Sequence, residues 1–477
     1  MASNGWPESP GARRGVVRTP AVRGLLSYGR IFFCQAEFLL KNSGNPGFTA
    51  PRVIARAAHN VSRDEISKSA LKVLYRLHKA GYQAFLVGGG VRDAMLELHP
   101  KDFDIATNAT PEEVRALFGN CRLIGRRFRL AHVRFGREII EVATFRAAAN
   151  HADDDSEHDH AGRIIRDNVY GTIDEDVWRR DFTCNALYYN IADFSIWDYV
   201  DGFEDVKRRR LVMIGDPAQR LREDPVRMLR AVRFAAKLNF TIDASVVDAM
   251  RGLTGLLANV PAARLFDEFQ KLFQSGFAER TFDLLREHRL FGELFPATEQ
   301  ELSRDENFMA FVRAALQNTD RRVSEDKSVT PMFLLGVFLW VPIKNLAASK
   351  RSEEKMSESQ SLALASFDIV AQQQHRISLP RRFTIPMREM LALQPRFEFV
   401  RGRRAMNLLE HRRFRAAYDF MLLQSEAGHI DAELARFWTD VQNQSTSERE
   451  VSFQMQAQPG KKRRPRRRRR RQSSQES

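Results

Sequence analysis

The stretch from Ala84 to Val114 constrains the fold of this chain more than any other. It opens with AFLV, a short apolar run that predicts a buried strand, followed by three glycines, Gly88–Gly90. Successive glycines allow a tight turn and a close approach of the backbone to a ligand. The next residues, VRDAML, predict the first turns of a helix, whose free N–H groups and dipole favour phosphate. Strand, glycine turn and helix in this order predict a phosphate-binding corner of an α/β domain.

Two acidic residues follow this corner after a short spacer, in the sequence Asp102-Phe103-Asp104. On a strand, residues i and i+2 point to the same face, so both carboxylates project together while Phe103 faces the core. Mg²⁺ prefers one or two carboxylates together with substrate phosphate oxygens. A lone DxD is a weak signal and is most often a solvated strand edge. The ordered combination with the glycine turn is far more specific, and it predicts a metal-dependent nucleotidyl transfer site.

In this order, GGGVRD and DFDIAT resemble the signature of a class of nucleotidyltransferases that contains bacterial poly(A) polymerases and CCA-adding enzymes. The resemblance implies that Asp102 and Asp104 bind the catalytic metals, two Mg²⁺ ions with Mn²⁺ as the alternative. It also implies that the glycine turn and the start of the helix hold the nucleotide triphosphate, through Gly88, Gly89, Arg92 and Asp93.

The pattern of apolar residues predicts an α/β part followed by a helical part, and the 477 residues suffice for about two to four domains. We expect an α/β nucleotidyltransferase head, a mixed sheet with flanking helices, followed by an all-α neck, body and C-terminal region. A helix over Ser62–Ala80, with Ser62 and Glu65 at capping-box spacing, precedes the AFLV strand. Further strands are expected at Leu130–Phe135, Ile139–Ala143 and Ala186–Ile191, and helices at Val226–Leu238, Ala263–Phe273, Glu279–Glu287 and Phe308–Gln317.

Composition and the resemblance together suggest seven segments along the chain. They are a poorly ordered N-terminal extension (1–56), the catalytic head (57–210), a nucleotide-recognising helical neck (211–275), a helical body (276–345), a polar linker or exposed helix (346–365), a helical RNA-binding region (366–445) and a disordered basic tail (446–477). Whether Met1 or a later start such as Val53 begins the folded protein stays open.

The charge of the chain is concentrated at its C-terminal end. The formal net charge is +15, and the run KKRRPRRRRRR at 461–471 contains basic residues and no acidic one. Such a block cannot pack and is attracted to polyanions, which favours nucleic-acid contact over a merely solvated tail. We expect RNA contacts from Lys461, Lys462, Arg463 and Arg464, and from Arg401, Arg403 and Arg404 in the basic helical block before them.

Cysteine usage and hydropathy indicate a cytoplasmic protein without a membrane span. The three cysteines, Cys34, Cys121 and Cys184, are odd in number and lack zinc-site spacing, which is typical of a reduced protein. The apolar stretch Ile31–Leu40 is interrupted by polar residues and is too short to cross a bilayer. A transit peptide in the Arg-containing first 30 residues is the alternative to a plain N-terminal extension.

A third carboxylate is expected from the stretch LIGRRFRLAHVRFGREIIEV, where alternation around Ile139–Val142 places Glu141 on a sheet face. In related folds such a neighbouring strand supplies a carboxylate near the DxD, although a solvent-facing Glu on an edge strand is an equal alternative. GRRFRLAHV, with Arg126 and Arg127, resembles the poly(A) polymerase version of this stretch more than the CCA-adding version. Both arginines are candidate RNA contacts.

The stretch RRDFTCNAL contains clustered arginines beside an acidic residue, which suits a polyanionic substrate because arginine binds phosphate bidentately. A surface salt-bridge cluster is the alternative. The stretch matches the family pattern RRDFTxNAL, which implies an active-site role for Asp181, either at the metals or in orienting an arginine. It also implies nucleotide contacts for Arg180 and Asn185.

The stretch REDPVRMLRAVRFAAKL begins with Asp224 and Pro225 in positions that suit an N-cap and a first helical residue. Capping is one complete explanation of Asp224. The other is a resemblance to the family element EDxxRxxRAxRF, in which Asp224 and Arg227 read the base, with Arg230 and Arg233 as further nucleotide contacts. A carboxylate and a guanidinium match the amine and ring nitrogen of adenine or cytosine, so the pair does not decide between ATP and CTP.

The polar stretch HADDDSEHDH at 151–160 lacks helical His spacing, and we interpret it as a solvated loop rather than a metal site. The resemblance over residues 58–345 and 381–423 favours a polymerase that adds AMP from ATP to RNA 3′ ends without a template, by two-metal in-line displacement. A CCA-adding tRNA nucleotidyltransferase and a non-catalytic RNA-binding protein are the alternatives. We expect a monomer whose candidate protein partners are RNA-decay proteins.

Overall fold

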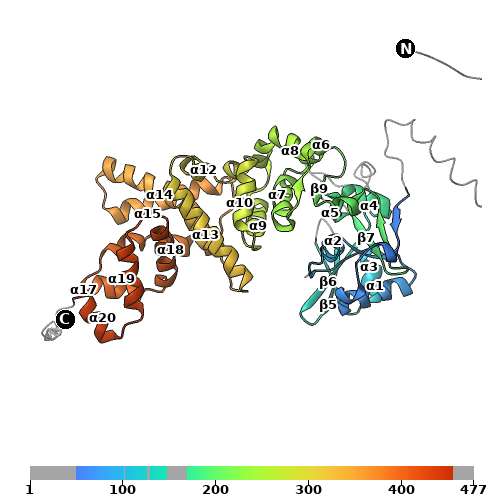
Figure 1. Ribbon diagram of the computed structural model, residues 1–477, viewed down its shortest axis with the longest axis horizontal. Coiled ribbons are helices and arrows are strands. Elements are labelled where there is room, and N and C mark those ends of the chain that lie inside the picture. Colours follow the sequence, from blue (N-terminus) through green and yellow to red (C-terminus); the bar gives the residue numbers. More distant parts are fainter. Residues whose placement is uncertain (1–49, 101, 126–128, 148–168, 455–477) are drawn as a thin grey trace, which may run out of the picture. The chain divides into compact units, whose positions relative to one another are not determined.

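The computed structural model describes residues 50–100, 102–125, 129–147 and 169–454 (Figure 1). The expected loop at 151–160, the paired Arg126 and Arg127, and the tail cations Lys461, Lys462, Arg463 and Arg464 lie outside the described residues.

A mixed sheet forms the centre of the N-terminal part. In the described ranges its eight strands follow the order β1-β8-β7-β2-β3-β6-β5-β4, with β3 and β6 parallel and the other neighbours antiparallel. The strands are β1 (Arg52–Ile54), β2 (Ala84–Val87), β3 (Asp104–Thr107), β4 (Cys121–Ile124), β5 (Leu130–Phe135), β6 (Glu138–Thr144), β7 (Leu187–Asn190) and β8 (Ile196–Asp198). The expected mixed-sheet head is confirmed.

Helices cover both faces of this sheet, which explains why all four residues of AFLV are buried. Ala84 and Leu86 pack with the core that includes α1 (Lys68–Lys79) and α3 (Pro111–Leu117). Phe85 and Val87 point to the opposite face and pack with α4 (Ile173–Arg179). A strand buried on both faces is a continuous apolar run without alternation. The two remaining helices of this part are α2 (Gly89–Met95) and α5 (Gly202–Lys207).

The rest of the described chain is helical apart from a short parallel pair, β9 (Arg210–Leu211) with β10 (Thr241–Ile242). The helices are α6 (Pro217–Glu223), α7 (Val226–Leu238), α8 (Ala244–Arg251), α9 (Ala262–Phe273), α10 (Ala278–Glu287), α11 (Phe291–Leu294), α12 (Pro296–Leu302), α13 (Glu306–Ser324), α14 (Pro331–Glu354), α15 (Glu358–Gln374), α16 (Arg381–Leu391), α17 (Gly402–Leu409), α18 (Phe414–Glu426), α19 (Ala432–Gln442) and α20 (Thr446–Ser452). The predicted helical neck and body are confirmed as helical.

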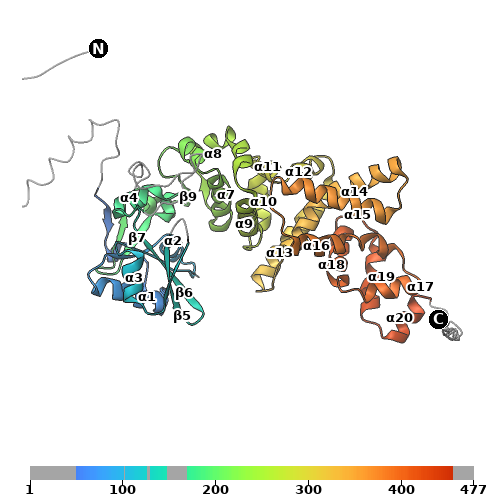
Figure 2. The same cartoon turned by 180° about the vertical axis from the view of Figure 1, so that it is seen from behind.

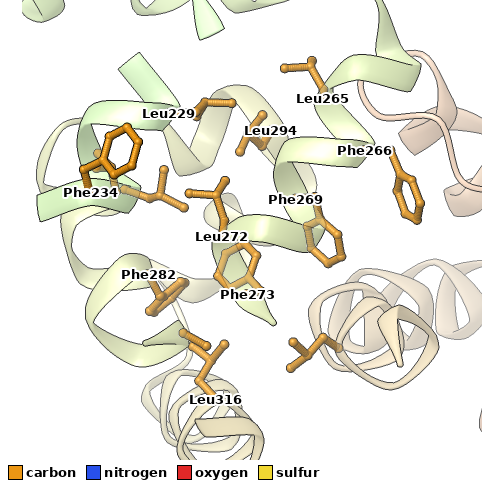
Figure 3. Packing of buried hydrophobic residues seen from close by; sticks show 14 of the residues in the cluster. Leu229, Phe234, Leu265, Phe266, Phe269, Leu272, Phe273, Phe282, Leu294 and Leu316 are labelled. Carbon is orange, nitrogen blue, oxygen red and sulfur yellow. The ribbon is translucent and has the colours of Figure 1, made fainter. Parts of the chain in front are cut away.

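Phenylalanine and leucine side chains fill the core between these helices, as the close view of α9 and its neighbours shows (Figure 3). The rings of Phe269 and Phe273 from α9 lie 5.2 Å apart, and Phe273 lies 5.3 Å from Phe338 of α14. Phe282 of α10 joins the same cluster. Edge-to-face and offset ring pairs at these distances add to the burial of large apolar surfaces, so the cluster holds α9, α10 and α14 together.

Helix α14 is long and apolar enough to cross a membrane by length and composition alone. However, 61% of its apolar window is buried inside the fold, where it contacts α13, α15, α16 and α18 (Figures 1 and 2). Burial against protein accounts for its apolar character, as in the core helix of a globular domain.

Three expected boundaries differ in the structure, and a fourth segment takes the alternative that was left open. The helix expected over Ser62–Ala80 is interrupted, because extended backbone at Ile66 buries that side chain and α1 starts only after the new cap Ser67. The extension expected over 1–56 ends in β1, which gains backbone hydrogen bonds by pairing with β8 and so forms the edge of the sheet. The expected linker at 346–365 is mostly α14 and α15, which agrees with the exposed-helix alternative. The tail expected from residue 446 begins with α20, because Phe453 is fully buried behind it.

Candidate active site

The glycine turn lies between β2 and α2, as expected. Gly88 has φ 69° and ψ −131°, a conformation that L side chains rarely adopt. A Cβ at Gly88 would lie 3.7 Å from Nη1 of Arg180, and one at Gly89 would lie 3.4 Å from Nη2 of Arg92. The turn therefore brings bare backbone next to two guanidinium groups, which suits a ligand with phosphate groups.

The two aspartates of the DxD lie beside this turn. Asp104 begins β3 and is paired with Val87 of β2 and with Glu141 of β6. Asp102 precedes the strand, and Phe103 between them is buried with 7% of its surface exposed, as predicted. Because residues opposite each other in a ladder share a face, Glu141 projects on the same side as Asp104. The structure thus places Glu141 beside Asp104 with half of its side chain exposed, and its role as a third carboxylate of the site stays a prediction.

The electrostatics of Asp104 reflect this crowding of carboxylates. Asp104 keeps contact with solvent, yet the pKa of its carboxyl is raised to about 6. Partial burial is the largest cause and repulsion by Glu141 and Asp102 adds to it, while the charge of Arg180 acts in the opposite direction. Glu141 is also held by His132, whose Nε2 lies 3.3 Å from its Oε1. Cations are therefore favoured at this point.

Asp181 is the centre of a buried network rather than a free carboxylate. Nε of Arg230 donates to Oδ2 of Asp181 at 2.7 Å, and Nδ2 of Asn185 donates to Oδ1 at 3.2 Å. Arg92 donates in turn to Oδ1 of Asn185. Burial alone would raise the pKa of Asp181, but the charge of Arg230 and the hydrogen bonds from Asn185, Arg230 and the Phe182 N–H hold it below the ordinary value. The network joins α7 to the turn at α2.

Arg180 is held by its own acidic partner. Its Nη2 donates to Oδ2 of Asp176 at 2.9 Å, and its Nε donates to the hydroxyl of Tyr188 at 2.8 Å. The Tyr188 hydroxyl donates to the same Asp176 oxygen at 2.7 Å. These bonds leave the guanidinium fixed over the glycine turn, which suits a phosphate contact.

Asp224 and Arg227 line the same cavity, but they do not pair with each other. The N-cap of α7 is Pro225 rather than the expected Asp224, although Oδ1 of Asp224 accepts from the N–H of Val226 at 3.2 Å. Oδ2 of Asp224 accepts from Arg264 of α9 at 2.7 Å. Nη1 of Arg227 donates to the Arg220 carbonyl at 2.6 Å and lies 3.1 Å from Glu223. Each group is held by a different neighbour, so both are oriented before a ligand binds.

Sequence reasoning did not single out Phe234, which organises three of the expected arginines. The guanidinium carbons of Arg92, Arg230 and Arg233 lie 5.4, 5.4 and 4.6 Å from the centre of its ring. A signal existed, because Arg230, Arg233, Phe234 and Lys237 are spaced i, i+3, i+4 and i+7 and share one face of α7. Favourable cation–π contacts explain how like charges can gather on that face.

These residues surround one cavity of about 1080 Å³. Of the residues expected at the site, it is lined by Gly88, Gly89, Arg92, Asp93, Asp102, Asp104, Arg180, Asp181, Asn185, Asp224, Arg227, Arg230 and Arg233. Further lining residues that were not expected include Phe234, Lys237, Arg264, Lys271, Gln274 and Phe277. The expected RNA contacts Arg401, Arg403 and Arg404 are not among them; they are exposed at the start of α17.

The two described cysteines are unpaired, and neither lies in this cavity. Burial raises the pKa of the Cys184 thiol to about 12, which leaves no thiolate for chemistry at neutral pH.

Three family models match the chain. The "Poly A polymerase head domain" matches residues 84–212, the "probable RNA and SrmB-binding site of polymerase A" matches 239–302, and the "polymerase A arginine-rich C-terminus" matches 354–472. Poly(A) polymerase I of Escherichia coli O6:H1 is 47% identical over 398 residues, which is 82% of this chain and 85% of that protein. The chain belongs to the poly(A) polymerase family.

Other members of the wider family are less similar. Poly(A) polymerase I of Haemophilus influenzae is 42% identical over 85% of this chain and 91% of that protein, whereas the CCA-adding enzyme of Bacillus pumilus is 37% identical over only 51% of the chain and 58% of that enzyme. Among solved structures, the CCA-adding enzyme of Bacillus stearothermophilus in complex with CTP has a TM-score of 0.51 at 25% identity, covering 80% of this chain and 84% of that one. The chain is thus a nucleotidyltransferase with the fold that both enzyme groups share.

Proposed function

We propose that this chain extends RNA 3′ ends with AMP from ATP, without a template, in the cavity between the glycine turn, the DxD and α7. The observation that carries the proposal is the meeting of all three elements around one cavity, in a member of the poly(A) polymerase family. The triphosphate, the metals and the base would then each have a separate set of contacts. The expected roles of individual residues are part of this proposal.

The carboxylates fit divalent metal ions. In the described residues no three His, Cys, Asp or Glu side chains form a ready-made metal cage, so a cation held by Asp102 and Asp104 would need oxygens from the substrate. Mg²⁺ binds in this way, with one or two carboxylates and substrate phosphates, and Mn²⁺ accepts the same oxygen ligands. Such ions supply Lewis-acid activation of the RNA 3′-hydroxyl and neutralise the departing pyrophosphate. Glu141 would add negative charge behind the pair.

The residues of the chain itself bind and orient the nucleotide. Backbone N–H groups of Gly88 and Gly89, with Arg92 and Arg180 beside them, would hold the triphosphate. Asp181 would act through Arg230 and Asn185, as a positioning residue, because its carboxyl oxygens already accept their hydrogen bonds. Fixed donors around a transferring phosphoryl group stabilise charge without reorganising during the reaction.

Asp224 and Arg227 would read the base. The Asp224 carboxylate would accept from the exocyclic amine, and the Arg227 guanidinium would donate to the ring nitrogen beside it. Guanine and uracil present the opposite pattern and would leave these groups unpaired. The same pair serves adenine and cytosine, so the length of the product, rather than the pair, separates poly(A) synthesis from CCA addition.

A primer-extension assay tests the proposal. The full chain is incubated with Mg²⁺, with ATP, CTP or both, and with either a generic RNA primer or a tRNA that lacks its CCA end. Long A tails on the generic primer are the expected result. Addition of C and then A to the tRNA alone would establish the CCA-adding alternative, and no extension of either RNA would contradict both. A cytoplasmic location, a monomeric state and contacts with RNA-decay proteins stay predictions.

A further inference from the structure

The cations that line the cavity fall into two groups by exposure. Arg92 and Arg227 are largely buried, with 3% and 14% of their side chains exposed, and carboxylate or carbonyl groups hold them in place. Arg264 and Lys271 of α9 are open to solvent, with 49% and 52% exposed. Lys237 of α7 is 40% exposed as well, whereas Arg264 and Lys271 share one helix, α9, where each is paired with a carboxylate, Asp224 and Glu268. One cavity therefore has a closed side and an open side.

Two substrates must occupy this cavity together, because nucleotidyl transfer joins a nucleotide to an RNA 3′-hydroxyl. Its volume of about 1080 Å³ is slightly above the range for a single small-molecule ligand, roughly 300–1,000 Å³. The closed side has the glycine turn and oriented donors that a triphosphate needs. Room and exposed positive charge remain on the side of α9, where a flexible polyanion would enter.

An exposed aromatic residue, Phe277, lies on this open side. It lines the cavity from the turn between α9 and α10, and 38% of it is exposed. The turn is held firmly on both sides of the ring: Gly276 has φ 86° and fits against Val323 of α13, and Asp320 of α13 accepts from the N–H groups of Ala278 and Glu279 at 2.6 and 3.1 Å. The helices concerned, α9, α10 and α13, lie next to one another in both views (Figures 1 and 2). The backbone on both sides of Phe277 is thus fixed by contacts to α13, yet the large apolar ring itself remains partly exposed to solvent.

The α9–α10 wall, formed by Lys271, Gln274, Ser275 and Phe277, lies within residues 239–302, which match the family's probable RNA-binding site. We infer that this wall binds the 3′-terminal nucleotides in particular, with Phe277 as the platform on which a base stacks. This inference rests on the proposed function. Proteins bind single strands by combining exposed cations, which follow the backbone, with aromatic rings, which stack on bases whatever their identity. The wall offers both, and a growing homopolymer end needs no more selective contact than stacking provides.

The first experiment compares Phe277→Ala, Phe277→Leu and Phe277→Trp with Tyr75→Ala, which removes an aromatic ring of similar exposure (40%) from α1. Loss of one stacking contact should raise both the Kd and the KM for an oligo(A) primer by about tenfold in the Ala and Leu variants. The Trp variant should restore both values, and the KM for ATP should not change. Because no charge is removed, the salt dependence of primer binding should also stay the same. Unchanged primer binding in Phe277→Ala, or a rise in the KM for ATP instead, would overturn the inference.

A second experiment uses the unaltered chain, so that it does not depend on the folding of a variant. An RNA primer with 4-thiouridine at its 3′-terminal position is cross-linked by light, and the protein is digested with trypsin. The wall contributes the peptide LFQSGFAER, residues 272–280, which ends at a tryptic site on each side. A cross-link on this peptide is expected, and cross-links confined to the C-terminal helices would contradict the inference. If the unaltered chain adds AMP but Phe277 proves irrelevant, only this inference fails; if it adds no AMP, the proposed function fails.

Discussion

At the scale of single residues, the DxD carboxylates are expected to carry the chemical step. Asp102→Ala or Asp104→Ala should slow extension by more than about 10³-fold, because each removes a metal ligand that stabilises the transition state. RNA binding should remain, since neither carboxylate is a phosphate contact. Steady-state extension at saturating primer, together with primer binding by fluorescence anisotropy, measures both quantities. Extension within about tenfold of the unaltered chain would rule out the assignment.

Asp181 should make the stability of the fold sensitive to acid. In the folded state the charge of Arg230 is the main reason that the pKa of Asp181 stays below its ordinary value, because burial acts in the opposite direction. A carboxyl group with a lowered folded pKa contributes stability above its unfolded pKa of about 3.9, and this contribution is lost as pH falls through the folded value. Asp181→Asn should therefore lower stability at pH 7 by about 3 kcal/mol, because Arg230 loses its buried partner.

The measurement for Asp181 is urea unfolding at several pH values. At neutral pH the variant should unfold at lower urea, and the difference from the unaltered chain should shrink below about pH 4. A difference that stays constant through this acidic range would mean that Asp181 does not titrate as its partners suggest. The variant Asp176→Asn provides the comparison with Asp181→Asn, because Asp176 holds a different arginine, Arg180, in a separate ion pair.

At the scale of elements, the packing of α5 against the RRDFTCNAL segment depends on one glycine. A Cβ at Gly202, the first residue of α5, would lie 2.2 Å from the carbonyl oxygen of Thr183 and 2.8 Å from its carbonyl carbon. Backbone atoms cannot give way as a flexible side chain does, so Gly202→Ala should destabilise the fold by about 3 kcal/mol. It should also displace the segment that holds Asp181 and Asn185, and so reduce extension.

Gly252→Ala is the matched control for this prediction. Gly252 caps α8, its φ of −97° is open to any residue, and a Cβ there would meet nothing within 4 Å. The control should leave thermal unfolding and extension unchanged. Equal midpoints of thermal unfolding for the two variants would show that α5 can shift without a loss of stability.

At the scale of the whole molecule, RNA affinity is expected to exceed what the cavity alone provides. Deleting residues 460–477 should weaken RNA binding and leave turnover at saturating RNA unchanged, because this segment contains clustered cations and a single acidic residue, Glu476, and none of the residues that line the cavity. Each lost phosphate contact on a single strand should make the slope of log affinity against log salt shallower by about 0.7. Replacing the basic residues of the segment by serine, at full length, is the control for chain length.

An unchanged salt slope after the deletion would show that the segment has another role. RNA affinity beyond the cavity would then rest on the exposed arginines at the start of α17, Arg401, Arg403 and Arg404. Charge-reversal of those three residues would change the salt slope in that case and would leave the KM for ATP unaltered.

By itself the sequence determined the parts of the site that depend on neighbours along the chain. The buried strand, the turn at Gly88 and the burial of Phe103 between two aspartates follow from short-range geometry, because the period of a strand and the freedom of glycine act over a few residues. The same holds for α7, whose bounds agree with the predicted Val226–Leu238.

Only the tertiary structure decided which charged groups meet. Arg230 binds Asp181 across 49 positions of sequence and Arg264 binds Asp224 across 40, and nothing local distinguishes these arginines from their neighbours. The exposure of Phe277 and the placement of β1 at the sheet edge were likewise undetermined. Such contacts depend on how whole helices and strands pack, and packing is set by the sum of many weak apolar contacts far apart in the chain, which no short motif records.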